Sequence, residues 1–179
     1  MRLFVAIDFP DALKLYLGAV GERLKSDSAI VAVAQQYHLT LKFLGEYPED
    51  KIQDLERRLS NVIFRPFKGR LSQIGTFGEG YETRVVWGGV EPVESFIKLA
   101  EEIDKLTPEV KKDYPDYSPH VTFARVKRIR ALTAFLDLVN GVRLEPREFY
   151  VQEFKLIRSI GGEEGHRYET LRAFPAKSL

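Results

Sequence analysis

Two stretches of the chain alternate between apolar and polar residues, and both contain the sequence His-x-Thr. Alternation with a period of two is typical of a strand that has one buried face and one exposed face. Such strands are expected at residues 37–44 and 120–126. In the first strand His38 and Thr40 fall on the polar face, which can border a wet cleft. The opposite, apolar face would carry Tyr37, Leu39, Leu41 and Phe43.

The remaining pattern predicts strands and amphipathic helices in both halves. Strands at residues 2–8 and 85–90 each precede a proline, Pro10 or Pro92, that opens an amphipathic helix. Further helices are expected after Pro48 and over residues 132–139. Residues 67–90 predict a hairpin turning near 78–80, and residues 147–158 and 167–174 predict closing strands around a glycine-rich loop at 161–165. Residues 30–36 suit a connection or short strand, and residues 108–119 a long loop.

The two His-x-Thr motifs recur at a fixed spacing. His120 lies 82 residues after His38, and Pro92 lies the same distance after Pro10. Each half therefore runs strand, proline, helix, His-x-Thr strand, helix. We expect one domain over residues 1–179 with an internal repeat of about 1–82 and 83–179, in which two histidines and two threonines face a shared site.

Composition narrows the class of protein. The formal net charge is +1, with acidic and basic residues interspersed, which argues against a protein that coats long nucleic acids but permits a ligand with one or two phosphates. No apolar run approaches the ~20 residues of a membrane span. The absence of cysteine removes disulfides and thiolate metal sites. We therefore expect a cytoplasmic protein that needs no membrane, no cofactor and no obligate protein partner.

The paired histidines indicate acid–base chemistry. A phosphodiester can be hydrolysed without metal by two proton-transfer groups on opposite sides of phosphorus, because the nucleophile and the leaving oxygen lie roughly in line. An unperturbed pKa of ~6.5 allows one imidazole to be neutral while the other is protonated. A threonine two residues after each histidine lies on the same strand face, where its hydroxyl can donate to a phosphoryl oxygen.

The spacing of possible ligands argues against a metal site at the histidines. Catalytic zinc needs three protein ligands, whereas each motif offers one histidine, and Asp8 and Asp116 stand at no recurrent ligand spacing. No metal is therefore expected. A lone His-x-Thr on a strand is usually a surface or core feature, but two of the three histidines occupy equivalent places. His166 has no counterpart and is expected to be solvated.

With both motifs established, the chain closely resembles the 2H phosphoesterase superfamily, and within it the RNA 2′,3′-cyclic phosphodiesterases, also called the 2′-5′ RNA ligase family. The resemblance implies a bilobal α+β fold, with antiparallel sheets lining a central cleft and helices packed outside. It also implies hydrolysis of a terminal 2′,3′-cyclic phosphate of RNA to a 2′-phosphate, and a possible reverse reaction that joins tRNA halves by a 2′-5′ bond. The segments that carry the resemblance are residues 2–10, 38–46, 86–90 and 119–125, with Ser159, Gly165 and Tyr168.

The resemblance also implies roles for single residues. His38 would protonate the leaving 3′ oxygen, and His120 would activate water. Strict alternation puts Arg125 on the face opposite His120, so a role for Arg125 on the phosphate requires a bulge or a twist at the end of the strand. Relatives often carry a tryptophan where this chain has Val31. The expected substrate-binding residues are Thr40, Thr122 and Arg125 at the phosphate, with Phe4 and Trp87 stacking on a base.

A second class of function stays open at this point. The same scaffold could serve as a non-catalytic module that binds RNA ends or nucleotides. Loss of one histidine would have favoured that module, and both are present. RNA ends or cyclic nucleotides are the expected partners in either case.

Overall fold

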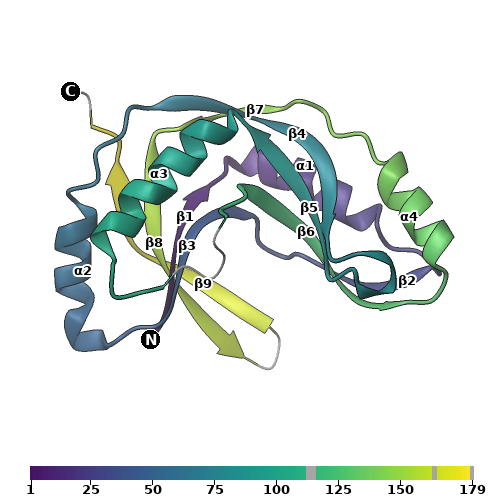
Figure 1. The fold of residues 1–179 in the computed structure, drawn as a ribbon, viewed down its shortest axis with the longest axis horizontal. Helices are drawn as coiled ribbons and strands as arrows, with labels where there is room; N and C mark the ends of the chain where they lie inside the picture. The colour runs from purple at the N-terminus through teal and green to yellow at the C-terminus, as the bar shows by residue number, and fades with distance from the viewer. Residues whose placement is uncertain (112–115, 163–164, 178–179) are drawn as a thin grey trace.

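The computed structural model describes residues 1–111, 116–162 and 165–177. Within these residues, nine strands form one antiparallel sheet in the order β7-β4-β5-β6-β3-β1-β8-β9, and β2 pairs with β6. The sheet curls, and the helices lie on its outer side (Figure 1). The strands are β1 (Arg2–Asp8), β2 (Ala29–Val33), β3 (His38–Glu46), β4 (Phe67–Phe77), β5 (Val85–Glu91), β6 (His120–Ile129), β7 (Glu148–Val151), β8 (Glu153–Gly162) and β9 (Gly165–Pro175).

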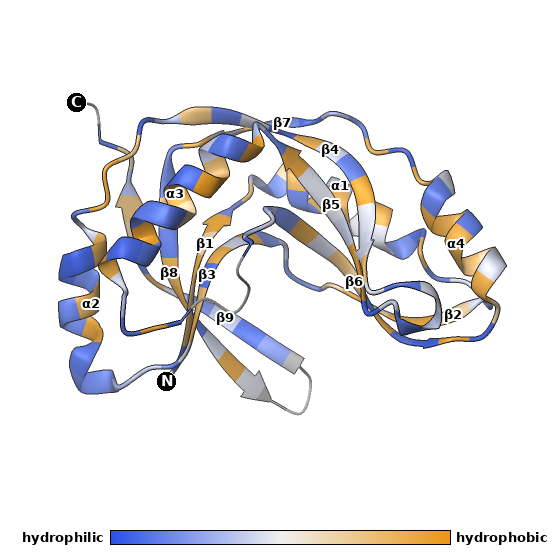
Figure 2. Cartoon of the chain, in the orientation of Figure 1, coloured by the Kyte–Doolittle hydropathy of each residue, from blue (hydrophilic) through white to orange (hydrophobic). Residues whose placement is uncertain are grey.

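The helices follow the predicted amphipathic patterns. They are α1 (Asp11–Glu22), α2 (Ile52–Leu59), α3 (Val93–Leu106) and α4 (Leu132–Gly141), with short 3₁₀ turns η1 (Glu49–Lys51) and η2 (Gly80–Glu82). Their apolar faces meet the sheet, while their outer faces are hydrophilic (Figure 2). No helix in the described parts of the chain is long and apolar enough to cross a membrane.

Most element predictions are confirmed with small changes of boundary. The single strand predicted at residues 147–158 is wrong, because this stretch forms two strands, β7 paired with β4 and β8 paired with β1. The predicted turn at 78–80 is real, and Gly78 and Gly80 adopt the positive φ angles of 84° and 54° that favour glycine. Residues 29–33 form the short strand rather than a connection. Two predicted loops fall partly on residues 112–115 and 163–164, which lie outside the described residues.

The expected α+β fold with antiparallel strands is confirmed, and the strands of both lobes belong to one sheet. The lobes meet between β3 and β6, where the pairing is the single partnership Leu39–Val121. On one side lie β1, β8 and β9, and on the other β5, β4, β7 and β2. The two His-x-Thr strands are therefore central neighbours.

Helices tie the lobes together across this central seam. The helix after β1, α1, packs against β6, whereas the helix after β5, α3, packs against β3. These paired elements start at corresponding places in the two predicted halves, Asp11 for α1 and Val93 for α3. We propose that the chain is one domain built from two related halves, each of which lends a helix to the other.

A shared β-bulge changes the direction of side chains in both His-x-Thr strands. In β3, Ala6 lies opposite Thr40 and Val5 opposite Lys42, so Leu41 is the extra residue. In β6, Trp87 lies opposite Thr122 and Val86 opposite Ala124, so Phe123 is the extra residue. An extra residue reverses the alternation beyond it.

Because of the bulge, the predicted orientations of two side chains in β3 are wrong. Phe43, expected in the core, is 48% exposed, because after the bulge it shares the face of His38. Lys42, expected on the cleft face, is 8% exposed. Its ammonium donates to Asp104 at 2.6 Å and to the hydroxyl and carbonyl oxygens of Thr107 at 2.9 and 3.0 Å. These bonds satisfy a buried charge and fasten the end of α3 to β3.

Candidate active site

The four residues of the two motifs gather at the central seam. Because the strands are antiparallel and Leu39 faces Val121, the register places His38 opposite Thr122 and Thr40 opposite His120. Residues directly opposite each other have Cβ atoms ~4.5–5.5 Å apart and share one face. The histidines therefore lie diagonally across a small square, with a hydroxyl beside each ring.

A half-buried tyrosine helps to hold this square together. The hydroxyl of Tyr117 donates to the carbonyl oxygen of Thr40 at 2.9 Å, across the seam. Tyr117 lies in the segment that delivers the chain to His120. Because a single residue pair, Leu39–Val121, joins β3 to β6, this bond adds a second link that fixes the segment before His120 against the first motif.

The His120 ring has a defined orientation. Its Nδ1–H donates to the carbonyl oxygen of Ser118 at 2.7 Å, which leaves Nε2 as the acceptor nitrogen. The ring packs edge-on against Phe77, with 4.8 Å between centroids, and lies 6.2 Å from Trp87. Burial lowers the pKa of His120, the bond to Ser118 opposes this, and the charge of Arg125 adds to it. His120 is therefore neutral near pH 7, and its free Nε2 can accept a proton.

The His38 ring is enclosed by aromatic side chains. It lies 4.8 Å from Phe4 and 5.1 Å from Tyr168, measured between centroids. Burial lowers the pKa of His38 to about 4, the Asp8 carboxylate opposes this, and the charges of Lys14 and His120 add to it. The influence of His120 on His38 reflects how close the two rings are.

Asp8 stands opposite His38 in the sheet and is held by two lysines. Lys14 approaches its carboxylate at 2.6 Å, and Lys155 donates to it at 3.0 Å. Burial raises the pKa of Asp8, but these hydrogen bonds outweigh that effect and hold the pKa below its ordinary value. A permanent negative charge thus lies beside His38 and favours its protonation.

The phosphate-binding residues of the prediction all lie on the histidine face. Thr40 and Thr122 are half-buried in the square. Arg125 reaches the same face because of the bulge at Phe123. Strict alternation would have placed Arg125 on the opposite face. Arg125 is exposed and has no side-chain partner within the described residues.

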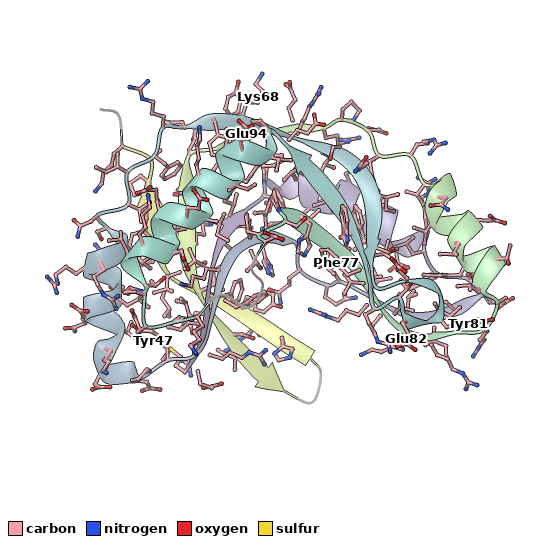
Figure 3. The ribbon with its side chains drawn as sticks, viewed as in Figure 1. Tyr47, Lys68, Phe77, Tyr81, Glu82 and Glu94 are labelled. Carbon is pink, nitrogen blue, oxygen red and sulfur yellow. The ribbon has the colours of Figure 1, made fainter. Side chains whose placement is uncertain are left out.

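The two aromatic residues predicted to stack on a base differ in accessibility. Phe4 is 3% exposed and lies beneath His38 and Tyr168, so it has no open face for a base. Its observed contact is the support of the His38 ring. Trp87 is half-buried, and its ring lies so close over Gly75 that a Cβ there would be 2.4 Å away. Phe77, whose ring centroid is 5.3 Å from that of Trp87, is 36% exposed and points toward the middle of the molecule (Figure 3).

A groove of about 760 Å³ opens on the His38 side of the square. One wall is α1, the other is the β8–β9 hairpin, and residues 33–38 form the floor. Its volume falls in the range of small-ligand sites, ~300–1,000 Å³. The lining residues include Asp8, Lys14, Gln36, His38, Tyr168 and Thr170.

No three His, Cys, Asp or Glu side chains of the described residues lie close enough together to hold a metal ion. Asp116, considered as a supplementary ligand, is exposed in the loop before β6. His166 is exposed on the hairpin, as expected, and its Nδ1 lies 3.2 Å from the hydroxyl of Ser159. Its backbone carbonyl accepts a hydrogen bond from Gln36 at 3.1 Å, which ties the hairpin to the groove floor.

Comparison with known proteins identifies the family. A model of the 2′-5′ RNA ligase superfamily matches residues 10–163. The chain belongs to this superfamily. A relative from Archaeoglobus fulgidus, named RNA 2′,3′-cyclic phosphodiesterase, is 36% identical over 97% of this chain and 99% of its own. A relative of the same name from Methanocaldococcus jannaschii is 31% identical over 96% of this chain and 99% of its own.

Solved structures agree with this superfamily fold. A crystal structure of a Thermus thermophilus protein superposes with a TM-score of 0.78 at 27% identity, covering 98% of this chain and 97% of that one. The structure of E. coli LigT complexed with 3′-AMP has a TM-score of 0.76 at 24% identity, covering 99% and 98%. The latter likeness shows the fold.

The sequence analysis did not predict that several of the residues that contact the two histidines would lie at the site. Tyr168 appeared only within the resemblance, and Phe77 and Ser118 were not singled out. Asp8 was weighed only as a metal ligand. Aromatic residues and single carboxylates on strands are common, so nothing in the sequence distinguishes those that touch a histidine ring. Their contacts arise from strand pairing between distant segments.

The lowered pKa of His38 predicts acid sensitivity of the fold. The native state holds His38 neutral down to about pH 4, whereas an unfolded histidine binds a proton near 6.5. The stabilisation is therefore complete above pH 6.5 and is lost as pH falls toward 4. We expect unfolding in denaturant to show about 2–3 kcal/mol less stability at pH 4.5 than at pH 7 from this residue.

Two variants isolate that contribution. His38→Gln should reduce the dependence of unfolding free energy on pH between 7 and 4.5 and leave the part that His120 contributes through its own lowered pKa, while His166→Gln, at an exposed position, should keep the full dependence. An unchanged slope in His38→Gln would contradict the burial argument. The carboxylates with lowered pKa, such as Asp8, titrate mainly below this window.

Proposed function

We propose that this protein hydrolyses RNA-terminal 2′,3′-cyclic phosphates to 2′-phosphates by acid–base catalysis with two histidines and no metal. The observation that carries the proposal is the square of two His-x-Thr motifs across the β3–β6 seam. The names of the relatives from A. fulgidus and M. jannaschii support the same substrate class. A retained histidine in each motif favours an enzyme over the non-catalytic RNA-end module.

His120 is proposed as the general base. With Nδ1 donating to Ser118, its free Nε2 accepts the proton of a water molecule that attacks phosphorus. The P–O3′ bond breaks on the far side, and His38 donates a proton to the leaving 3′ oxygen. The product carries a 2′-phosphate and a 3′-hydroxyl, and proton exchange with solvent restores both rings.

The negative charge of the bound substrate is proposed to favour protonation of His38. Burial keeps His38 neutral in the free protein, whereas the acid role requires a protonated ring. A bound phosphodiester anion beside the ring favours the imidazolium, and the Asp8 carboxylate acts in the same direction. Protonation of His38 is therefore coupled to binding of the anionic end, which limits imidazolium formation to the occupied site.

Thr40, Thr122 and Arg125 are proposed to hold the phosphate. Each threonine hydroxyl lies opposite a histidine in the square, where it can donate to a non-bridging oxygen. Arg125 adds positive charge on the same face. Because the leaving 3′ oxygen faces His38, the nucleoside is placed in the groove on the His38 side, next to Tyr168.

The reverse reaction is proposed to use the same groups. A 5′-hydroxyl takes the place of water at His120 and attacks phosphorus as the P–O3′ bond breaks. His120 accepts the proton of the 5′-hydroxyl and His38 protonates the 3′ oxygen, which yields a 2′-5′ phosphodiester. No nucleotide cofactor is needed, because the strained cyclic phosphate is already activated.

Identification of the product tests the function. The protein should convert RNA ending in a 2′,3′-cyclic phosphate into the 2′-phosphate alone, with turnover that survives excess chelator, because two side chains supply both proton transfers. Phosphorus NMR or chromatography against 2′- and 3′-phosphate standards reads the result. A 3′-phosphate or a mixture would contradict the assignment of acid and base, and chelator-sensitive turnover with bound zinc would contradict the metal-free mechanism.

A further inference from the structure

The two histidines of the square are held in different ways. The ring of His120 is fixed by the hydrogen bond from its Nδ1 to the carbonyl oxygen of Ser118. Within the described residues, neither ring nitrogen of His38 has a hydrogen-bond partner. The two motifs are alike in sequence, so this difference comes from the elements that pack around each ring.

Aromatic rings contact His38 where a hydrogen bond is lacking. The ring of Tyr168, on β9, is nearly perpendicular to that of His38, with 5.1 Å between centroids and 85° between planes. The ring of Phe4, on β1, lies 4.8 Å from His38 at 36°. Tyr168 and Phe4 also touch each other, with 5.2 Å between their centroids. The three rings are therefore in mutual contact.

Contacts other than that with His38 keep Tyr168 in place. Phe4 and Ile157, which pair across β1 and β8, belong to a small buried apolar cluster apart from the main core, and Tyr168 packs against this cluster. The β8–β9 hairpin that carries Tyr168 projects from the rest of the sheet (Figure 1). It is tied to the groove floor by the hydrogen bond from Gln36 to the carbonyl oxygen of His166 at 3.1 Å. Tyr168 is thus a fixed wall for the ring beside it.

The charged groups around His38 do not by themselves select its protonated form. Asp8 on β1 favours a proton on His38, whereas Lys14 on α1 and His120 on β6 oppose it. The carboxylate of Asp8 is also paired with Lys14 and with Lys155 of β8, so much of its charge is compensated. A further source of stabilisation for the imidazolium is therefore needed.

The aromatic contacts supply such stabilisation. A cation within ~6 Å of the centroid of an aromatic ring is attracted to the ring's negative face. Imidazolium is a cation and neutral imidazole is not, and both ring contacts of His38 fall within that distance. Within the described residues, the hydroxyl of Tyr168 has no hydrogen-bond partner, so its observed contact with His38 is made by the ring.

We propose that Tyr168 is a positioning residue for the acid: its ring orients His38 toward the leaving oxygen and stabilises the protonated form that donates to it. This inference rests on the proposed function, because it concerns the acid of that reaction. It assigns the effect to the aromatic ring of Tyr168 and not to the hydroxyl. Phenylalanine should therefore replace tyrosine, whereas leucine, which fills similar space without an aromatic face, should not.

The pH profiles of two variants test the role. Tyr168→Leu should lower kcat for 2′,3′-cyclic nucleotides by about ten-fold and leave KM nearly unchanged, because the defect lies in the acid. The alkaline limb of the kcat profile, where His38 loses its proton, should move to lower pH by about half a unit or more. The acid limb, which reports His120, should stay in place. Tyr168→Phe should retain the wild-type rate to within about two-fold and both limbs.

A matched control makes the same chemical change elsewhere. Tyr81→Leu, at a 60% exposed position on η2 and away from the hairpin (Figure 3), should leave kcat, KM and both limbs unaltered. Fluorinated phenylalanines at position 168 keep the shape of the ring while weakening its negative face, so they test the ring even if Tyr168→Leu fails to fold. The alkaline limb should move further to lower pH with each added fluorine.

Several outcomes would overturn the proposal. If Tyr168→Phe were as slow as Tyr168→Leu, the hydroxyl and not the ring would be responsible. A rise in KM alone would make Tyr168 a substrate contact. An alkaline limb that moved to higher pH in Tyr168→Leu, or that ignored fluorination, would mean that the ring only keeps water from His38.

Failure of the proposed function gives a different result. If wild-type protein left 2′,3′-cyclic nucleotides intact, the catalytic assignment would be wrong. The proton NMR signal of the His38 ring, followed against pH with inorganic phosphate present, would still test the ring contact without turnover. If wild-type protein hydrolysed them and Tyr168→Leu kept the wild-type rate and profile, the positioning role alone would be wrong.

Discussion

Replacing His120 or His38 by alanine is expected to lower kcat/KM for 2′,3′-cyclic nucleotides by roughly 10²–10⁴-fold, the range for loss of a general acid or base. Each ring lies on the cleft face, packed against aromatic side chains that remain in place after truncation. We therefore expect the fold to survive, as circular dichroism would show. His166→Ala is the control, since its exposed ring touches neither motif, and an equal loss in that variant would contradict the assignment.

The dependence of rate on pH distinguishes the two histidines. Wild-type activity should follow a bell-shaped profile, because one ring must be protonated and the other neutral. His120→Ala should retain only the decline toward high pH, where His38 loses its proton. His38→Ala should retain only the rise toward high pH, where His120 becomes the free base. The opposite pattern would exchange the roles of acid and base.

Removing a threonine hydroxyl from the square is expected to have the second largest effect. Thr40→Val or Thr122→Val keeps the branched shape that suits a strand but leaves a non-bridging phosphoryl oxygen without a donor. A lost donor of this kind costs about 10²–10³-fold in kcat, because its bond strengthens as charge moves onto the oxygen in the transition state. Steady-state kinetics should show a larger change in kcat than in KM.

A matched replacement away from the site provides the comparison for the threonines. Thr133→Val makes the same chemical change at an exposed place on α4 and should leave both constants unaltered. If Thr40→Val and Thr122→Val raised KM but kept kcat, the hydroxyls would bind ground state and transition state equally, and their proposed role in catalysis would be wrong.

The pattern of the sequence was sufficient for the main elements and for the two motifs. The period-two runs around His38 and His120 and the amphipathic runs after Pro10 and Pro92 are local signals, because backbone geometry alone relates them to structure. The fixed spacing of the two His-x-Thr motifs then singled out the pair that the sheet brings together. These features needed no knowledge of distant contacts.

Alternation failed where the two motif strands bulge. The periodicity placed Phe43 in the core and Arg125 on the far face, and both predictions depend on an unbroken register. A bulge is a property of a strand pair, since the extra residue is defined only against the partner strand. β3 and β6 bulge at equivalent residues, and this reorients the side chains that follow in each.

By itself, the sequence determined which residues are the candidates for the chemistry, because histidine and threonine two apart share a strand face in any sheet. Only the tertiary structure decided how that chemistry is tuned and supplied. Strand pairing placed Asp8 beside His38, buried both rings so that their pKa values are lowered, and turned Arg125 onto the histidine face through the bulge at Phe123. The physical reason is that burial, charge proximity and register are relations between segments distant in the chain, which no local pattern encodes.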